Sequence, residues 1–81
     1  MERADIEKTI NDFLGEEIEI EKELIKDDAL LKNDLGIDSL DFVDIVVLVE
    51  RHFGFKIKAE EMTDIRTLRQ FYDYIEDKVN A

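Results

Sequence analysis

The sequence predicts a small all-α bundle of three main helices and one short helix, with a long loop between the first two. Apolar residues recur at helical spacing in three segments, and no strands are indicated. The 81 residues contain no Trp, no Pro and only three Gly, so the core must be built from Ile, Leu, Val and Phe. We expect one domain over residues 1–81, with the thin core typical of this size.

The first helix is predicted near the start of the chain, where four apolar residues fall at i, i+4, i+7 and i+8. We expect Gly15 to end this helix, because glycine readily adopts the left-handed conformation of a helix C-terminus. The apolar face consists of Ile6, Ile10, Phe13 and Leu14.

Residues 16–37 form the long loop. A structureless loop of that length is unusual in a compact domain, so we expect its apolar side chains to pack on the helices. A short turn is expected near residues 28–31. The side chains expected to pack are Ile18, Ile20, Leu24, Leu30, Leu31 and Leu35.

The middle helix is predicted over residues 39–53, and its first residue is a serine. Asp38 is able to accept hydrogen bonds from the free backbone N–H groups of the first turn, with Asp41 three residues later. Gly54 supplies the stop signal. This pattern places the Ser39 hydroxyl at the exposed first turn, at the positive end of the helix dipole. Such a serine suits modification by another enzyme and does not suit a role as a nucleophile of its own.

The middle helix is apolar on more than one face. Its expected core stripe is Ile45, Val46, Val49 and Phe53. Val43 and Val47 lie outside that stripe, along the same edge as Ser39. An apolar strip bordered by carboxylates predicts a docking surface. The alternative is a buried central helix with extra valines. The carboxylates flanking the strip are Asp41, Asp44 and Glu50.

The remaining elements are an extended link at residues 55–57, a brief helical turn around residues 59–62, and a last helix. Thr67 and Gln70 form a capping box, in which each side chain satisfies the other's backbone N–H. The apolar stripe of the last helix is Leu68, Phe71, Tyr72, Ile75 and Val79.

The net charge of −11 excludes nucleic acid as a partner and favours basic proteins. Residues 1–50 hold 16 acidic and 5 basic groups and carry the whole −11, whereas residues 51–81 hold 6 of each. No segment is long and apolar enough to span a membrane, and no signal peptide is recognisable. We expect a cytoplasmic monomer. Without cysteine there is no disulfide framework or thiolate metal site.

No intrinsic enzyme activity and no metal site are predicted. His52, the only histidine, has no cysteine or serine partner recognisable in the sequence. The aspartates between residues 27 and 41 miss the spacing that a calcium-binding EF-hand loop requires.

The string Leu35-Gly36-Ile37-Asp38-Ser39-Leu40 resembles the attachment motif of acyl carrier proteins, and the similar apolar pattern extends from about Ile6 to Ile75. The resemblance implies that Ser39 carries 4'-phosphopantetheine, transferred from coenzyme A by a phosphopantetheinyl transferase, and that Asp38 belongs to the motif. It implies a carrier of acyl thioesters for fatty-acid or specialised lipid or polyketide biosynthesis. Partners would be acyl-transferring and condensing enzymes with basic docking patches.

The same resemblance implies an acyl pocket between the helices. The bulky Phe71 would favour a short or differently shaped cargo. Two alternatives stay open: a D-alanyl or aminoacyl carrier, and an acidic interaction domain without a prosthetic group. The pocket candidates are Ile45, Val46, Val49, Ile57, Met62, Leu68, Phe71 and Ile75.

The chain departs from the family pattern at two places. Lys58-Ala59 replace a usual proline and acidic cap, so we expect the short helix to lack its start signal and its negative charge. Arg51 and His52 stand where acids are common, so we expect partners with a narrower basic footprint, or with an acid that contacts Arg51. These departures favour a carrier dedicated to one specialised pathway.

Overall fold

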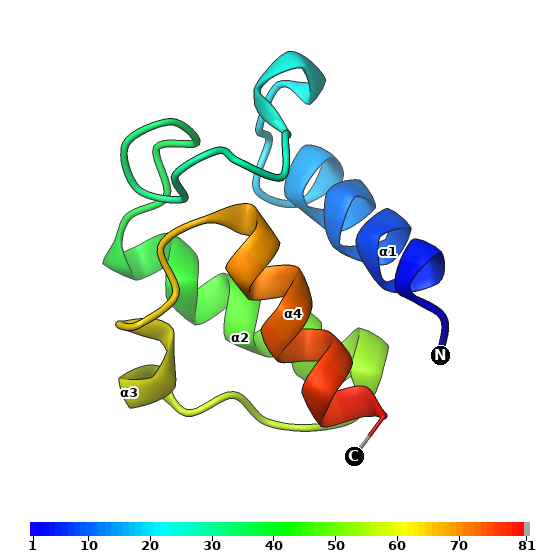
Figure 1. Cartoon of the computed structure of the whole chain (residues 1–81). Helices are drawn as coiled ribbons and strands as arrows, with labels where there is room; N and C mark the ends of the chain where they lie inside the picture. The colour runs from blue at the N-terminus through cyan, green and yellow to red at the C-terminus, as the bar shows by residue number, and fades with distance from the viewer. Residues whose placement is uncertain (81) are drawn as a thin grey trace.

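Four α-helices make up the fold in the computed structural model, which describes residues 1–80 without the side chain of Ala59. Figure 1 shows α4 passing in front of α2, with α1 on one side and α3 on the other. In the described residues the only strand-like pairing is an isolated bridge between Leu30 and Thr67. The predicted all-α class is confirmed. The helices are α1 (Arg3–Glu16), α2 (Ser39–Phe53), α3 (Ala59–Met62) and α4 (Leu68–Val79).

Helix α1 packs on α4 through its predicted apolar face, all four residues of which are buried. The prediction that Gly15 ends the helix is wrong. Gly15 stays helical, and the Glu17 N–H still donates to the Phe13 carbonyl at 2.8 Å. The left-handed residue that reverses the chain is Glu19, with φ of 63°. A glycine ends a helix only where the backbone itself turns left-handed, and here that point lies four residues later.

The loop between α1 and α2 contains a short 3-10 helix, Lys22–Leu24, which the sequence did not predict. Most of the predicted loop packing is confirmed, because the side chains of Ile20, Leu31 and Leu35 are buried and Ile18 packs partly on the core. The prediction is wrong for two leucines. Leu24 is 44% exposed and Leu30 is 37% exposed. Ala29 and Ile37 are buried in the core as well.

Backbone hydrogen bonds fix the second half of this loop to the start of α4. The Leu31 N–H donates to the Arg66 carbonyl at 2.9 Å, and the Leu68 N–H donates to the Ala29 carbonyl at 3.0 Å. Turns lie on both sides of Leu30, at residues 27–28 and 31–34, where one short turn was expected. The loop therefore delivers the chain to α2 from a fixed position.

Helix α2 has the predicted bounds. Gly54 ends it in the left-handed conformation, with φ of 81°, and donates its N–H to the Glu50 carbonyl at 3.0 Å. The core stripe differs in part from the prediction: Leu48 belongs to it, whereas Val46 and Phe53 are only half-buried. The fully buried residues of α2 are Ile45, Leu48 and Val49.

Helix α3 is short and is held by side chains of α4. No side-chain cap satisfies its start at Lys58, as predicted. The expectation that it lacks negative charge is wrong, because Glu60 and Glu61 both lie within it. Glu61 accepts a hydrogen bond from the Tyr74 hydroxyl, and its other carboxylate oxygen lies 3.8 Å from the Lys78 amine. The predicted capping box at the start of α4 is confirmed.

Candidate functional site

The first turn of α2 is organised by two aspartates around Ser39. One carboxylate oxygen of Asp38 accepts hydrogen bonds from the N–H groups of Leu40 and Asp41, both at 3.0 Å. Asp41 completes the capping box by accepting from the Asp38 N–H at 3.2 Å. Gly36, with φ of 70°, makes the turn that brings the chain to this cap. The predicted capping by Asp38 is confirmed.

Ser39 differs from every other hydroxyl-bearing residue of the described chain. It is exposed at the first position of α2, it is the only serine in the sequence, and its hydroxyl makes no hydrogen bond within residues 1–80. Each of the other hydroxyls takes part in an internal hydrogen bond, at Thr9, Thr63, Thr67, Tyr72 and Tyr74. The structure therefore leaves one hydroxyl free for an external reaction.

The Ser39 hydroxyl makes no hydrogen bond to a basic side chain within residues 1–80, and the nearby carboxylates of Asp38 and Asp41 accept backbone N–H groups of the cap. The only histidine, His52, lies at the opposite end of α2, roughly 20 Å away at about 1.5 Å per residue. It is exposed and its ring stacks on Phe13, with 5.7 Å between the ring centroids. Within residues 1–80 no group of His, Asp or Glu side chains is arranged to hold a metal ion. Neither the histidine nor a metal-binding group of the described residues is therefore placed at the Ser39 hydroxyl.

An apolar strip leads away from Ser39 along α2. Val43 is 61% exposed and Val47 is 49% exposed, so the alternative of a fully buried helix is wrong. Leu40 is 75% exposed and lies three residues before Val43, on the same face. Sequence reasoning missed Leu40 in this strip, although its spacing to the two valines carried the signal. We call Leu40, Val43 and Val47 the apolar strip.

The charged residues predicted beside the strip have different surroundings. Asp44, Glu50 and Arg51 are exposed, and none of them forms an ion pair in the described chain. Asp44 and Arg51 border one shallow cavity of about 290 Å³ together with Val47. Asp41 is half-buried, and one of its carboxylate oxygens is used in the cap. Three charged groups are therefore free to meet a partner.

A groove of about 250 Å³ opens next to Ser39, between the start of α2 and the end of α3. In Figure 1 the chain that leaves α3 runs past the first turns of α2, which is where this groove lies. Its walls are almost wholly carbon, and only Ser39 and Thr63 bring a hydroxyl. We call it the near groove, and it is lined by Ser39, Phe42, Val43, Val46, Met62 and Thr63.

The structure divides the eight predicted pocket residues into two groups. Val46 and Met62 line the near groove. The other six are packed in the core with at most 5% of their surface exposed, so a role for them in holding cargo stays a prediction. These six are Ile45, Val49, Ile57, Leu68, Phe71 and Ile75.

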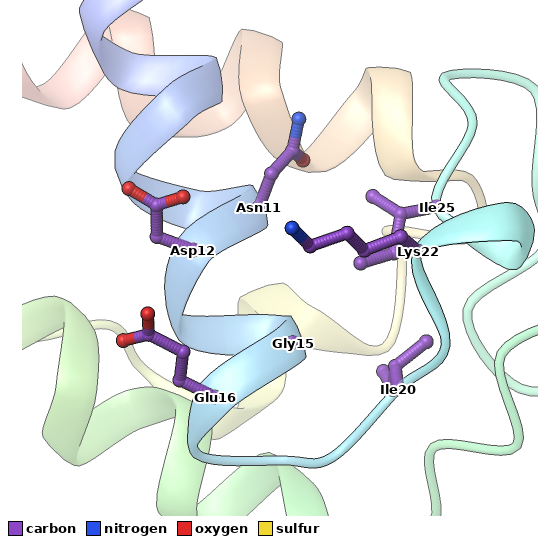
Figure 2. A pocket seen from close by; sticks show the side chains of 7 residues that line it. All are labelled: Asn11, Asp12, Gly15, Glu16, Ile20, Lys22 and Ile25. Carbon is purple, nitrogen blue, oxygen red and sulfur yellow. The ribbon is translucent and has the colours of Figure 1, made fainter.

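A separate cavity of about 450 Å³ lies between the end of α1 and the loop that follows it. Figure 2 shows Asp12 and Glu16 on α1, with the Lys22 side chain extending from the loop toward that helix. Its lining is of mixed polarity and includes no residue of α2. No helix among residues 1–80 combines the length and the apolar character that crossing a membrane requires.

Two comparisons with known proteins agree with this geometry. The sequence model of the family described as "Phosphopantetheine attachment site" matches residues 6–75, a range that includes the free serine. The chain is also similar to a protein of Coprothermobacter proteolyticus named "Acyl carrier protein". The two are 37% identical over 79 residues, which cover 98% of this chain and 96% of the relative.

Proposed function

Since the chain belongs to the phosphopantetheine-attachment family of acyl carrier proteins, we propose that Ser39 is the residue that bears its 4'-phosphopantetheine arm. The observation that carries this proposal is the state of the hydroxyls. Ser39 is exposed and free, whereas every other hydroxyl of residues 1–80 takes part in an internal hydrogen bond. The protein is a carrier and not a catalyst.

The surroundings of Ser39 fit a covalently attached phosphate. The Asp38 carboxylate is directed to two backbone N–H groups and makes no hydrogen bond to the Ser39 hydroxyl. The N-terminal end of α2 favours negative charge by about 0.3–1 kcal/mol at an exposed position. The near groove begins at Ser39, so an apolar group carried on the arm has a surface to rest on. When attached, the arm supplies the terminal thiol that holds an acyl group as a thioester.

Attachment is a substitution at phosphorus in which Ser39 acts as the acceptor. The bond from the serine oxygen to phosphorus forms, the pyrophosphate bond of coenzyme A breaks, and the adenosine bisphosphate half leaves. The serine proton passes to a base on the phosphopantetheinyl transferase, because no side chain of residues 1–80 accepts a hydrogen bond from the Ser39 hydroxyl and the Asp38 and Asp41 carboxylates are engaged in the cap. The carrier contributes the position of the hydroxyl and the docking surface beside it.

We assign docking of the transferase, and of acyl-transferring and condensing enzymes, to the apolar strip and the charges beside it. The exposure of Val43 and Val47 supports this assignment, and so do the free carboxylates of Asp44 and Glu50. Arg51 adds a positive charge at the far end of the strip. A partner that matches this surface needs basic groups near Ser39 and an acidic group opposite Arg51. This mixed charge requirement favours dedicated enzymes of one lipid or polyketide pathway.

The near groove also bears on the chemical class of the cargo. An apolar groove beside the attachment point supports a hydrocarbon acyl group more than an aminoacyl or D-alanyl group, whose ammonium would be desolvated there. A single domain over residues 1–81, a monomeric state and a cytoplasmic location stay predictions.

The decisive experiment measures intact mass after incubation with coenzyme A, magnesium and a broad-specificity phosphopantetheinyl transferase. The wild type should gain one phosphopantetheine and Ser39→Ala should gain none. Thr63→Val is the matched control, because Thr63 is the other hydroxyl in the near groove and its removal should leave the modification intact. No addition to the wild type, in a reaction where a known carrier is modified, would overturn the assignment.

A further inference from the structure

The shallow cavity of about 290 Å³ beside the apolar strip has a second wall that belongs to the end of α1. Its α2 side presents Asp44, Val47 and Arg51, which the proposed docking surface already includes. Its other side consists of Glu17 and Ile18, which directly follow α1 and have no role in that surface. We call it the α1–α2 cavity, and it is lined by Glu17, Ile18, Asp44, Val47, Leu48 and Arg51.

Backbone and aromatic contacts hold the α1 wall of this cavity in place. The N–H groups of Glu17 and Ile18 both donate to the Phe13 carbonyl, at 2.8 Å and 3.2 Å. The Phe13 ring stacks on His52 near the end of α2, with 5.7 Å between the ring centroids. On the α2 side, Leu48 is 5% exposed and belongs to the buried core. The backbone at Glu17 is therefore fixed relative to α2, and the cavity exists before any partner binds.

Glu17 and Asp44 bring uncompensated negative charge to the α1–α2 cavity. Both are exposed, and neither forms an ion pair within residues 1–80. The last turn of α1 has no basic residue, so the negative end of its helix dipole adds to the two carboxylates. The one base in the lining, Arg51, follows Asp44 by seven residues, about 10 Å along α2 at 1.5 Å per residue. The cavity therefore attracts a cation at the end away from Arg51.

The apolar part of the lining indicates which cation fits. Ile18, Val47 and Leu48 are aliphatic, so they are able to cover the methylene stem of a long side chain whose charged end stays near water. A guanidinium is planar, always charged and carries five N–H donors, so it is able to bond two carboxylates at once. An ammonium is a compact and strongly hydrated charge that loses more water on entering the cavity. The lining therefore matches arginine better than lysine.

We propose that the α1–α2 cavity receives an arginine side chain of the phosphopantetheinyl transferase, so that the docking surface extends from α2 onto the end of α1. The inference rests on the proposed attachment at Ser39 and adds Glu17 and Ile18 to the residues that contact the partner. Glu17 and Asp44 bind the guanidinium, and Ile18 and Val47 cover its stem. One long side chain in a cavity of this size reaches both carboxylates.

The test is a double-mutant cycle on the rate of modification. The second-order rate constant kcat/KM for transfer of phosphopantetheine to the carrier is measured by intact mass at low and at high salt. The carriers are the wild type, Glu17→Gln, Asp44→Asn and the double variant, and urea unfolding verifies that each is folded. Glu16→Gln is the matched control, since Glu16 is the neighbouring exposed glutamate but lines the separate cavity on the loop side of α1 (Figure 2).

Glu17→Gln should lower kcat/KM by about fivefold to tenfold at low salt, between the values for an exposed ion pair and a charge-assisted hydrogen bond. Glu16→Gln should change it by less than about twofold, because an exposed charge outside the contact acts only through screened distance. The double variant should lose less than the product of the two single losses. Once one carboxylate is removed, the guanidinium is no longer held in the geometry that the other carboxylate requires.

Two further measurements report on occupancy of the cavity and not on its charge. Ile18→Trp fills the space without changing the charge, so it should slow modification at every salt concentration. In a titration of the Ser39→Ala carrier with the transferase, which binds it without reaction, the backbone amide signals of Glu17 and Ile18 should shift. The amide signal of Glu16 should shift less.

Three outcomes would overturn the proposal. Equal losses in Glu16→Gln and Glu17→Gln would mean that net charge, and not a contact at the cavity, controls the rate. Single losses that multiply in the double variant would mean that Glu17 and Asp44 do not share one arginine. A folded Ile18→Trp carrier modified at the wild-type rate would show that no side chain enters. Failure of attachment at Ser39 is a separate result, because the wild type would then gain no mass at all.

Discussion

Asp38 combines a structural role with a position beside the modified residue. Its carboxylate satisfies two N–H groups of the first turn of α2, and its own N–H is satisfied by Asp41. A carboxylate next to a phosphate would repel it, so the negative charge of Asp38 does not serve to hold the arm. The helix cap explains why position 38 holds a hydrogen-bond acceptor. Recognition by the transferase is the remaining use for the negative charge of Asp38.

Substitutions of Asp38 separate these two roles. Asp38→Ala should lower the free energy of unfolding by about 1 kcal/mol, within the range typical of a lost N-cap. Asp38→Asn keeps a cap acceptor of equal quality, so its stability in urea unfolding should match the wild type, while its modification by the transferase becomes slower. An asparagine variant as unstable as the alanine variant would mean that the charge, and not the hydrogen bonds, stabilises the turn.

Asp44 is exposed beside the apolar strip and forms no ion pair in the described chain, so its charge is available for steering a basic partner. Asp44→Lys should slow the second-order rate of modification by the transferase, and the slowing should be larger at low salt than at high salt. Asp77→Lys, with the same charge change at an exposed position of α4, should have a smaller effect. Equal slowing at all salt concentrations would rule out steering by Asp44.

At the scale of single residues, the sequence predicted those site residues whose positions depend only on their spacing at the start of α2. Asp38, Ser39 and Asp41 lie within four consecutive positions at a helix start, and their geometry required no distant contact. Leu40 and Phe42 were missed in the site for a different reason. The exposure of Leu40 and the position of Phe42 in the near groove depend on how α3 packs against α2, which one helix pattern does not specify.

Among the elements, α3 depends on side chains outside itself. It has only four residues and no N-cap hydrogen bond at Lys58, so it has little intrinsic stability. Glu61 links it to Tyr74 and Lys78 of α4, and the Lys78 amine also lies 5.5 Å from the centroid of the Tyr74 ring. Because Met62 and the adjoining Thr63 line the near groove, these contacts also hold one wall of the site.

The Tyr74 contact makes a pH-dependent contribution whose sign follows from its pKa. Burial, and then the hydrogen bond to Glu61, raise the pKa of Tyr74 to about 12 in the folded protein, from 10.0. A raised pKa means that the contribution to stability is complete below pH 10 and is lost as the pH rises toward 12. The stability difference between wild type and Tyr74→Phe should therefore decrease over this interval in urea unfolding. A constant difference would contradict the pKa shift.

Tyr72 supplies the control for this prediction. Burial raises the pKa of Tyr72 to about 12 as well, but its hydroxyl contacts Asn11 of α1 and not α3. Both phenylalanine variants should change the alkaline stability. Only Tyr74→Phe should accelerate hydrogen exchange of the amides of residues 60–62. Faster exchange there in Tyr72→Phe would show that α3 responds to global stability and not to its own contact.

The helices themselves were predictable to different degrees. The bounds of α2 follow from Asp38 at one end and Gly54 at the other, and the structure reproduces both. The end of α1 was not predictable from Gly15, because the left-handed turn lies at Glu19, a residue type that rarely adopts it. The 3-10 helix at Lys22–Leu24 has no buried residue and left no apolar pattern to detect.

On the scale of the whole molecule, ion pairs join parts of the chain that the sequence leaves far apart. Arg3 of α1 contacts Asp73 of α4 at 2.7 Å, and Arg69 of α4 contacts Asp27 of the loop at 2.8 Å. The two backbone hydrogen bonds beside the bridge between Leu30 and Thr67 also join the loop to the start of α4, one donated from each side. These contacts specify the packing of the loop, which periodicity within a segment is unable to reveal.

Repulsion among the acidic residues of the first half of the chain opposes the packing of α1 and the loop on the rest of the molecule. Residues 1–50 carry the whole net charge of −11, and the last turn of α1 has no basic residue to offset its negative end. The exposed ion pairs contribute little each, about 0–1 kcal/mol. Self-repulsion of the acidic half should therefore outweigh them in the response to salt.

This balance predicts that salt stabilises the protein. Raising the ionic strength from about 0.01 M to about 0.1 M shortens the screening length from about 30 Å to about 10 Å, so repulsion across a molecule of 30 × 26 × 20 Å is weakened more than contacts within an ion pair. The urea midpoint should rise with sodium chloride, and rise less in Glu16→Gln, which removes one acid at the end of α1. A urea midpoint that falls with salt would show that the ion pairs between α1, the loop and α4 outweigh the repulsion among the acidic residues. In that case the acidic residues of the first half would not lower the stability of the fold, and their charge would serve binding to partners.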